Sequence, residues 1–240
     1  MKLSLECRTD MLEMVQPFGD FDWVLAKEVL TDETYAEYYR NSDRLKFVDN
    51  SVNEEGEPVS LEEMEEVFKL VNGNYIVSPD WIGDATRTIE AYGECVERFS
   101  REVVVGVVQG VTFKEAMACL NIYESGVLSI PYDICSSKED PPWLMGLRRA
   151  LLVSNIPSDR IIHLLGFTSL DEFYWYEGKP NVYSIDTGIP VLLGLQGMDI
   201  LDPLGKKDKP TYNEMQKFEL GQKEWTAICR NIALLRKWMP

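Results

Sequence analysis

The chain has 240 residues, a mass of 27.5 kDa and 45% hydrophobic residues, enough to bury the core of one large domain. Its formal net charge of −16 would repel a nucleic-acid duplex over most of its surface. No apolar run reaches the roughly 18 residues that a membrane helix needs, and Glu6 and Asp10 interrupt the N-terminus, so we expect a soluble, cytoplasmic protein without a membrane segment.

Cysteine usage indicates neither a disulfide framework nor a zinc site. The five cysteines are an odd number, they are widely spaced without a C-x-x-C pair, and His163 is the only histidine available to join them. We therefore expect no bound metal and no cofactor. The cysteines are Cys7, Cys95, Cys119, Cys135 and Cys229.

Short apolar runs rich in β-branched residues recur roughly every 25 to 30 residues, each followed by polar turn residues and a helical period. This alternation is typical of βα units. The predicted strands, in chain order, are Lys2–Cys7, Trp23–Ala26, Lys46–Asp49, Tyr75–Ser78, Val103–Gln109, Val127–Pro131, Ile161–Gly166 and Val182–Asp186.

Side chains that can accept hydrogen bonds from free backbone N–H groups mark the starts of five helices. Three are S/T-x-x-E capping boxes and two are single aspartates. They are Ser60 with Glu63, Thr112 with Glu115, Ser169 with Glu172, Asp84, and Asp140 before Pro141.

Eight strands in this length favour an α/β fold of the (β/α)8 TIM-barrel type, as a single domain spanning residues 1–240. An open Rossmann-like sheet is the alternative, although no glycine-rich nucleotide motif follows a strand. Residues 202–240 are predicted to form a loop and one long closing helix, with Met215, Phe218, Gln222, Trp225, Ile228, Ile232 and Leu235 on its buried face.

Acidic and amide side chains stand where several predicted strands end. In a parallel barrel these ends share one mouth, and no Lys or Arg occurs beside them in the sequence. Such a cluster would suit a Mg²⁺ site, acid/base and nucleophilic work at a glycosidic carbon, or recognition of the N–H edge of a purine. The residues are Asp49, Asp80, Asp84, Gln109, Asp133 and Asp186.

Simpler roles are open for some of these residues. Asp84 has the position of a helix cap, and Asp133 that of a turn residue. Asp49 and Asp186 each follow an apolar strand, where capping alone does not call for a charge. Gln109, next to Gly110, carries both a donor and an acceptor, which suits a nucleobase better than a metal.

Four segments, in order, carry a family resemblance: FVDNSVNEEGE from Phe47, SPDWIGDATRT from Ser78, VVQG from Val107 and VYSIDTGIPV from Val182. Together they resemble the tRNA-guanine transglycosylases, and most closely their virus- and island-encoded relatives that insert 7-deazaguanines into DNA. The resemblance runs from Lys46 to Pro190, about 60% of the chain.

The resemblance implies a role for each matched residue. Asp186 falls on the nucleophile and Asp49 on the general acid/base. Asp80 falls on the reader of the guanine N1 and N2 edge, Gln109 on the contact to the base carbonyl, and Gly110 and Asp84 lie in the same segments. Trp81 is placed to stack on a base, and Ile130 stands where the family has a glycine whose backbone contacts the base.

The chain also departs from the family. The zinc subdomain after the nucleophile, with three cysteines and a histidine, is absent, because only Cys229 follows Asp186. Pro131 and Ile130 replace a glycine pair, and a proline has no N–H to donate. DNA is therefore a better substrate candidate than tRNA.

Charge is divided unequally along the chain. Residues 201–240 hold eight Lys or Arg against five acids, so residues 1–200 carry 16 minus 35, or −19. Nucleic acid is expected to meet Lys206, Lys207, Lys209 and the C-terminal helix, and the acidic remainder is suited to a protein partner.

These features predict a guanine transglycosylase that exchanges guanine for a 7-deazaguanine through a covalent glycosyl-aspartate. Two alternatives use the same pocket: a nucleoside or nucleotide N-glycosidase, and a barrel that binds a nucleobase or a protein without catalysis. A Mg²⁺-dependent phosphoryl enzyme is a third. The relatives imply a virus-encoded enzyme acting in the cytoplasm of its host.

Overall fold

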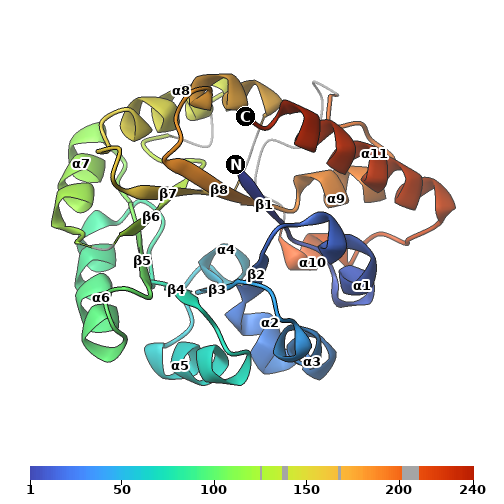
Figure 1. The fold of residues 1–240 in the computed structure, drawn as a ribbon, viewed down its shortest axis with the longest axis horizontal. Helices are drawn as coiled ribbons and strands as arrows, with labels where there is room; N and C mark the ends of the chain where they lie inside the picture. The colour runs from blue at the N-terminus through green and yellow to red at the C-terminus, as the bar shows by residue number, and fades with distance from the viewer. Residues whose placement is uncertain (125, 137–139, 167–168, 202–210) are drawn as a thin grey trace.

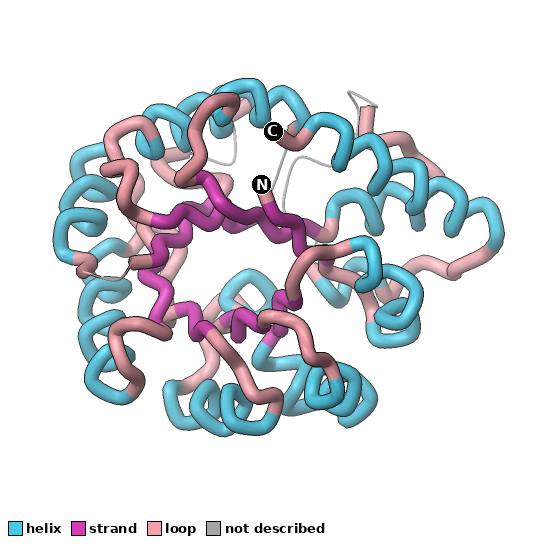
Figure 2. Tube along the Cα trace, viewed as in Figure 1, coloured by secondary structure: helices cyan, strands magenta, loops and turns pink. Residues whose placement is uncertain are grey.

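Eight parallel strands form a nearly closed ring, with helices covering its outside (Figures 1 and 2). The computed structural model describes residues 1–124, 126–136, 140–166, 169–201 and 211–240. The protein is thus a (β/α)8 TIM-type barrel, as predicted. The strands are β1 Lys2–Leu5, β2 Asp22–Leu25, β3 Lys46–Asp49, β4 Tyr75–Val77, β5 Val104–Val107, β6 Val127–Pro131, β7 Ile161–Leu165 and β8 Val182–Thr187.

Neighbouring strands pair in parallel from β2 through β8 to β1. Between β1 and β2, a side chain takes the place of a backbone acceptor. The Trp23 N–H donates to Ser4 Oγ at 3.0 Å. The turn before β2 is held to β1 at its start, where the Leu3 N–H donates to Asp20 Oδ2 at 2.8 Å. Arg236 pairs with the same carboxylate, so the C-terminal helix also closes this seam.

Helices follow most strands, as the βα pattern predicts. They are α1 Leu12–Val15, α2 Ala26–Thr31, α3 Glu33–Asn41, α4 Val52–Glu55, α5 Leu61–Leu70, α6 Ala85–Arg98, α7 Phe113–Ile122, α8 Pro142–Val153, α9 Ile189–Leu195, α10 Tyr212–Met215 and α11 Gln222–Trp238. Three short 3-10 helices accompany them: η1 Thr9–Met11, η2 Gln16–Phe18 and η3 Leu170–Tyr176.

Three of the five predicted helix caps are confirmed. Ser60 and Thr112 form complete capping boxes at the starts of α5 and α7. Asp84 caps α6 by accepting the Arg87 N–H at 3.0 Å. These side chains satisfy N–H groups that a helix start leaves without an internal partner.

The other two predicted caps depart from expectation because buried or half-buried arginines take the carboxylates: the Asp140 cap is wrong, and Ser169 caps its helix without the predicted box. Asp140 pairs with Arg148 at 2.5 Å, and α8 begins after Pro141 without a side-chain cap. Ser169 accepts from the Asp171 N–H at the start of η3, while Glu172 pairs with Arg149 instead of completing a box.

The predicted closing helix is divided into α10 and α11. The break falls before Gly221, whose N–H donates to Glu224 Oε2 at 3.1 Å and starts the second helix. Helix α11 packs closely on α9, because a Cβ on Gly194 would lie 2.4 Å from Ile228 Cγ1. Buried Asn231 bonds the backbone of Pro190, Met198 and Ile200, and so fixes the register of this pair.

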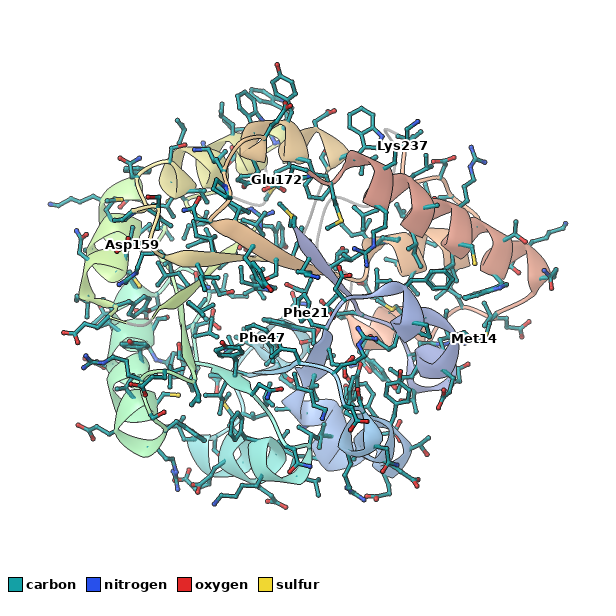
Figure 3. The ribbon with its side chains drawn as sticks, viewed as in Figure 1. Met14, Phe21, Phe47, Asp159, Glu172 and Lys237 are labelled. Atoms are coloured by element: carbon teal, nitrogen blue, oxygen red, sulfur yellow. The ribbon has the colours of Figure 1, made fainter. Side chains whose placement is uncertain are left out.

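Aromatic rings fill part of the barrel interior. Trp23 stacks on His163 with ring centroids 4.4 Å apart, and Phe47 stacks between Trp23 and Tyr75 at 5.7 and 4.7 Å. Phe21 and Phe47 lie inside the ring of strands (Figure 3). Stacked rings supply large buried areas with few rotatable bonds, so they keep the centre of the barrel rigid.

Arg149 of α8 ties the carboxyl ends of β6 and β7 together. It is fully buried, forms a two-pronged ion pair with Glu172, and donates to the carbonyl oxygens of Ile130, Leu165 and Gly166. Tyr176 donates to the same Glu172 at 2.8 Å. The charge is thus compensated and every nearby carbonyl has a donor, as a buried ion pair requires.

We predict that Arg149→Met lowers the free energy of unfolding by about 3–5 kcal/mol, because it leaves Glu172 charged and buried. Urea denaturation followed by circular dichroism measures this change. As a control, Arg101→Met removes an exposed pair with Glu124 and is expected to cost at most about 1 kcal/mol. Equal losses in the two variants would contradict the importance of the buried pair.

Candidate active site

The carboxyl ends of five consecutive strands, β3 to β7, surround a cleft at the mouth of the barrel. The mouth cleft holds about 450 Å³ of space that no protein atom occupies, including space at its open side. The centre of a water molecule can reach about 50 Å³ of it. Its lining residues are Asp49, Val52, Asn53, Asp80, Ile82, Gln109, Pro131, Tyr132, Asp133 and Leu165.

Asp80 and Gln109 meet in this cleft, as the sequence predicted. Gln109 Nε2 donates to Asp80 Oδ2 at 2.6 Å, and the Gly83 N–H donates to Gln109 Oε1 at 3.0 Å. Asn50 Nδ2 donates to Asp80 Oδ1 at 2.7 Å. The two ends of the Gln109 amide are thus distinguished by their partners, and the Asp80 carboxylate, 1% exposed, is held on both oxygens.

Asp49 lines the same cleft from the end of β3. Its Oδ2 accepts the Ser51 N–H at 3.0 Å, and Ser51 has a left-handed backbone with φ of 62°. Ser51 Oγ accepts the Lys27 N–H, and Asn50 Oδ1 accepts the Val52 N–H. A non-glycine residue in this conformation costs on the order of 1 kcal/mol or more, which these side-chain bonds offset while holding Asp49 toward the cleft.

Asp186 lies at the end of β8 but does not line the mouth cleft. It is fully buried, and its Oδ1 accepts the Gly166 N–H at 2.9 Å. The same oxygen is 2.9 Å from His163 Nε2. Gly166 directly follows Leu165, which does line the cleft, so Asp186 stands immediately behind that wall.

His163 was missed by the sequence analysis, which considered it only as a zinc ligand. Its Nδ1 lies 2.9 Å from Ser184 Oγ and its Nε2 reaches Asp186. Both contacts depend on pairing β7 with β8, where His163 and Ser184 are register partners. A lone histidine in an apolar strand gives no sequence signal of that pairing.

Two other predicted binding residues have structural roles and do not line the mouth cleft. Gly110 has φ of 152°, and a Cβ there would lie 2.6 Å from the Ala116 backbone nitrogen, so it permits close packing on α7. Ile130 is fully buried, and its carbonyl accepts from Arg149. Ile130 thus has no exposed backbone to offer a ligand.

Trp81 and Asp84 also lie outside the lining of the mouth cleft. The Arg87 guanidinium stands 4.2 Å from the centre of the Trp81 ring, so one face of the ring is covered by a cation. Asp84 acts as the cap of α6. Neither residue is placed to hold a base in this cleft as the structure stands.

Four lining residues of the cleft were not expected from the sequence: Ile82, Tyr132, and Val52 and Asn53 after β3. Ile82 is 58% exposed at the rim. Tyr132 and Asp133 follow β6 and form the wall that faces Gln109 across Pro131. Asp133 was recognised as a strand-end acid, and the cleft position of this residue is now established.

The mouth carries a high density of negative charge near α2 and α4. Burial, followed by the neighbouring charges of Glu54, Asp32 and Glu55, raises the pKa of Glu28 to about 7, against a smaller opposing effect of Lys27. Glu28 is 8% exposed. Bringing another anion to this side of the mouth is therefore unfavourable.

The described residues contain neither a candidate metal site nor a candidate membrane-spanning helix. Among the described residues, no group of three His, Cys, Asp or Glu side chains has the arrangement of a metal site. No helix in the described ranges has the length and apolar character needed to cross a membrane. All five cysteines are free thiols. Lys206, Lys207 and Lys209, predicted to meet nucleic acid, lie outside the described residues.

Comparison of the chain with protein-family models and with curated proteins gives no match.

We predict that Glu28→Gln raises stability more at pH 8 than at pH 5. With a pKa of about 7 in the folded protein against 4.5 without its surroundings, Glu28 binds its proton more tightly when folded. Ionisation of Glu28 therefore does not lower the free energy of unfolding at low pH. Between pH 4.5 and 7 it lowers this free energy by a growing amount. We expect a gain of about 1–3 kcal/mol at pH 8, reduced by more than half at pH 5.

Urea denaturation of both proteins at the two pH values measures this effect. Exposed Glu37 on α3 provides the matched control, Glu37→Gln, for which the difference from wild type should not depend on pH. A Glu28→Gln gain that is the same at pH 5 and pH 8 would exclude the predicted ionisation.

Proposed function

We propose that the protein exchanges a guanine base at an N-glycosidic bond, through a covalent link between Asp186 and the sugar. The observation that carries the proposal is the convergence of Asp49, Asp80 and Gln109 in one cleft, with Asp186 directly behind its Leu165 wall.

The cleft has the hydrogen-bonding groups that a guanine edge requires. A carboxylate has about four acceptor positions and an amide nitrogen has two hydrogens, so Asp80 and Gln109 keep bonding capacity beyond their mutual contact. Asp80 would accept from the N1–H and amino group of guanine, and the second Gln109 N–H would donate to the carbonyl. Asn50 holds the Asp80 carboxylate in place for this task.

The proposed reaction has two equivalent halves. A carboxylate oxygen of Asp186 forms a bond to the anomeric carbon as the bond from that carbon to the base nitrogen breaks, and the electron pair leaves with the base. Asp49 gives its proton to the departing base. The incoming base then loses a proton to Asp49 and attacks the same carbon, which releases the Asp186 carboxylate.

Access to Asp186 sets a condition on this mechanism. Asp186 is fully buried in the absence of substrate, so the Leu165 side of the cleft must move when a nucleotide binds. Leu165 contributes an apolar side chain to the wall, and apolar contacts are non-directional, so they can rearrange at small cost.

The substrate class we favour is guanine in DNA. The chain has no equivalent of the zinc-bearing segment that follows the nucleophile in the tRNA enzymes. The incoming base would be guanine or a 7-deazaguanine. Contacts to the phosphates would fall to the basic C-terminal part of the chain, including Lys217, Lys223 and Arg230.

We predict that the protein incorporates radiolabelled guanine into guanine-containing DNA, and that a glycosylated Asp186 peptide is detectable by mass spectrometry after denaturation. Asp186→Asn should abolish both signals. Asp49→Asn should lower the exchange rate by about 10²- to 10⁴-fold, the usual value of a general acid/base. Labelled guanine is a sufficient probe, because exchange of like for like needs no other base.

Parallel reactions with a tRNA transcript and with guanosine identify the substrate class. Asp159→Asn changes an exposed acid before β7, at the opposite end of that strand from the cleft, and is the control expected to keep the wild-type rate. Wild-type exchange by Asp186→Asn would overturn the proposal. Release of free guanine without incorporation would instead indicate an N-glycosidase.

A further inference from the structure

His163 and Asp186 form a buried pair whose geometry determines which atoms are protonated. Asp186 Oδ1 accepts the Gly166 N–H, and the same oxygen is 2.9 Å from His163 Nε2. If the carboxylate is ionised it has only acceptors, and this contact then requires a hydrogen on Nε2. In a neutral ring Nδ1 is then an acceptor, and Ser184 Oγ stands 2.9 Å from it as the donor.

The surroundings fix the orientation of the imidazole. The His163 ring is fully buried and lies almost parallel to Trp23, with 10° between the planes and 4.4 Å between the centroids. Phe21 meets it edge-on at 6.1 Å. The ring is therefore held by packing on its face and by hydrogen bonds at both nitrogens, as is typical of a histidine that orients another group.

We propose that His163 is a positioning residue for Asp186, and that together with the Gly166 N–H it holds Oδ1 and so fixes the orientation of the carboxylate that bonds the sugar. This inference rests on the function proposed above. His163 does not itself touch the substrate, and it acts only through the Asp186 carboxylate.

Two donors on Oδ1 affect the two halves of the reaction differently. When Asp186 is esterified to the sugar, Oδ1 becomes the carbonyl oxygen and its negative charge is largely lost. When the incoming base displaces Asp186, the charge returns to a carboxylate whose Oδ1 is again bonded by both N–H groups. The donors therefore stabilise the leaving carboxylate, and they keep the covalent intermediate from accumulating.

The first test uses the wild-type protein and needs no enzymatic activity. Because His163 is the only histidine, a sample labelled with ¹⁵N-histidine has one imidazole, and its spectrum is assigned without ambiguity. We expect a directly bonded hydrogen on Nε2 that is slow to exchange with water. An unprotonated Nε2, with the hydrogen on Nδ1, would overturn the inference.

The second test compares His163→Phe with His163→Gln. Phenylalanine keeps a stacked ring but has no donor, whereas the glutamine amide nitrogen occupies about the place of Nε2. In labelled-guanine exchange, we expect His163→Phe to raise the steady-state fraction of glycosylated Asp186 by about ten-fold or more, and to lower turnover by a similar factor. His163→Gln should restore most of both values.

The outcomes separate this inference from the proposed function. No base exchange by the wild-type protein is a failure of the proposed function, and the inference falls with it. An active wild type in which His163→Phe folds and has an unchanged covalent fraction overturns the positioning role alone. If His163→Phe does not fold, the imidazole spectrum and the kinetics of His163→Gln still test the positioning role. A His163→Gln variant whose glycosylated fraction of Asp186 departs from the wild-type value would contradict it.

Discussion

The register of the parallel strands is the constraint on which the candidate site depends. Leu25 pairs with Asp49, and Leu5 with Thr187, so β2 ends beside the end of β3 and β1 beside the end of β8. A slip of one residue would turn every side chain of a strand to the other face. Asp49 is directed to the mouth only because the apolar residues before it are committed to the barrel.

Two polar networks hold the residues that follow these strands. One joins Asn50, Asp80, Gln109 and the Gly83 N–H across the ends of β3, β4 and β5. The other runs from Glu172 through Arg149 to the Gly166 carbonyl, and from the Gly166 N–H to Asp186. Gly166 thus connects a structural ion pair to the proposed nucleophile through a single peptide position.

Much of the fold could be predicted because the signals are local. The eight β-branched runs became eight strands, and Ser60 and Thr112 became capping boxes, since both patterns depend on residues close in sequence. Glu172 shows where such reasoning ends. Its spacing from Ser169 predicts a capping box, but Arg149, 23 positions away, forms a buried pair with it instead, and a tertiary interaction of this strength overrides a local preference.

The candidate site likewise contains residues that the sequence predicts and residues that only the structure identifies. Strand-end position alone indicated Asp49, Asp80, Gln109 and Asp133, and the structure places all four around the mouth cleft. Strand-end position could not indicate that Asp186 is buried, because burial depends on the loops that cover a strand end. His163 escaped notice for a related reason, since its partners Ser184 and Asp186 are reached only by pairing β7 with β8.

The two networks are separate in the structure. Asp80 and Gln109 bond each other at 2.6 Å, and Asp186 Oδ1 is bonded by Gly166 and lies 2.9 Å from His163 Nε2. The mouth cleft lies between them, walled by Pro131, Tyr132 and Leu165. In the proposed function, a base held by Asp80 would carry its sugar toward the Leu165 wall, and the covalent bond to that sugar would be the interaction that requires both halves at once. Binding energy from the base would then be available to open the wall in front of Asp186, which is how an enzyme uses remote contacts to organise its reacting atoms.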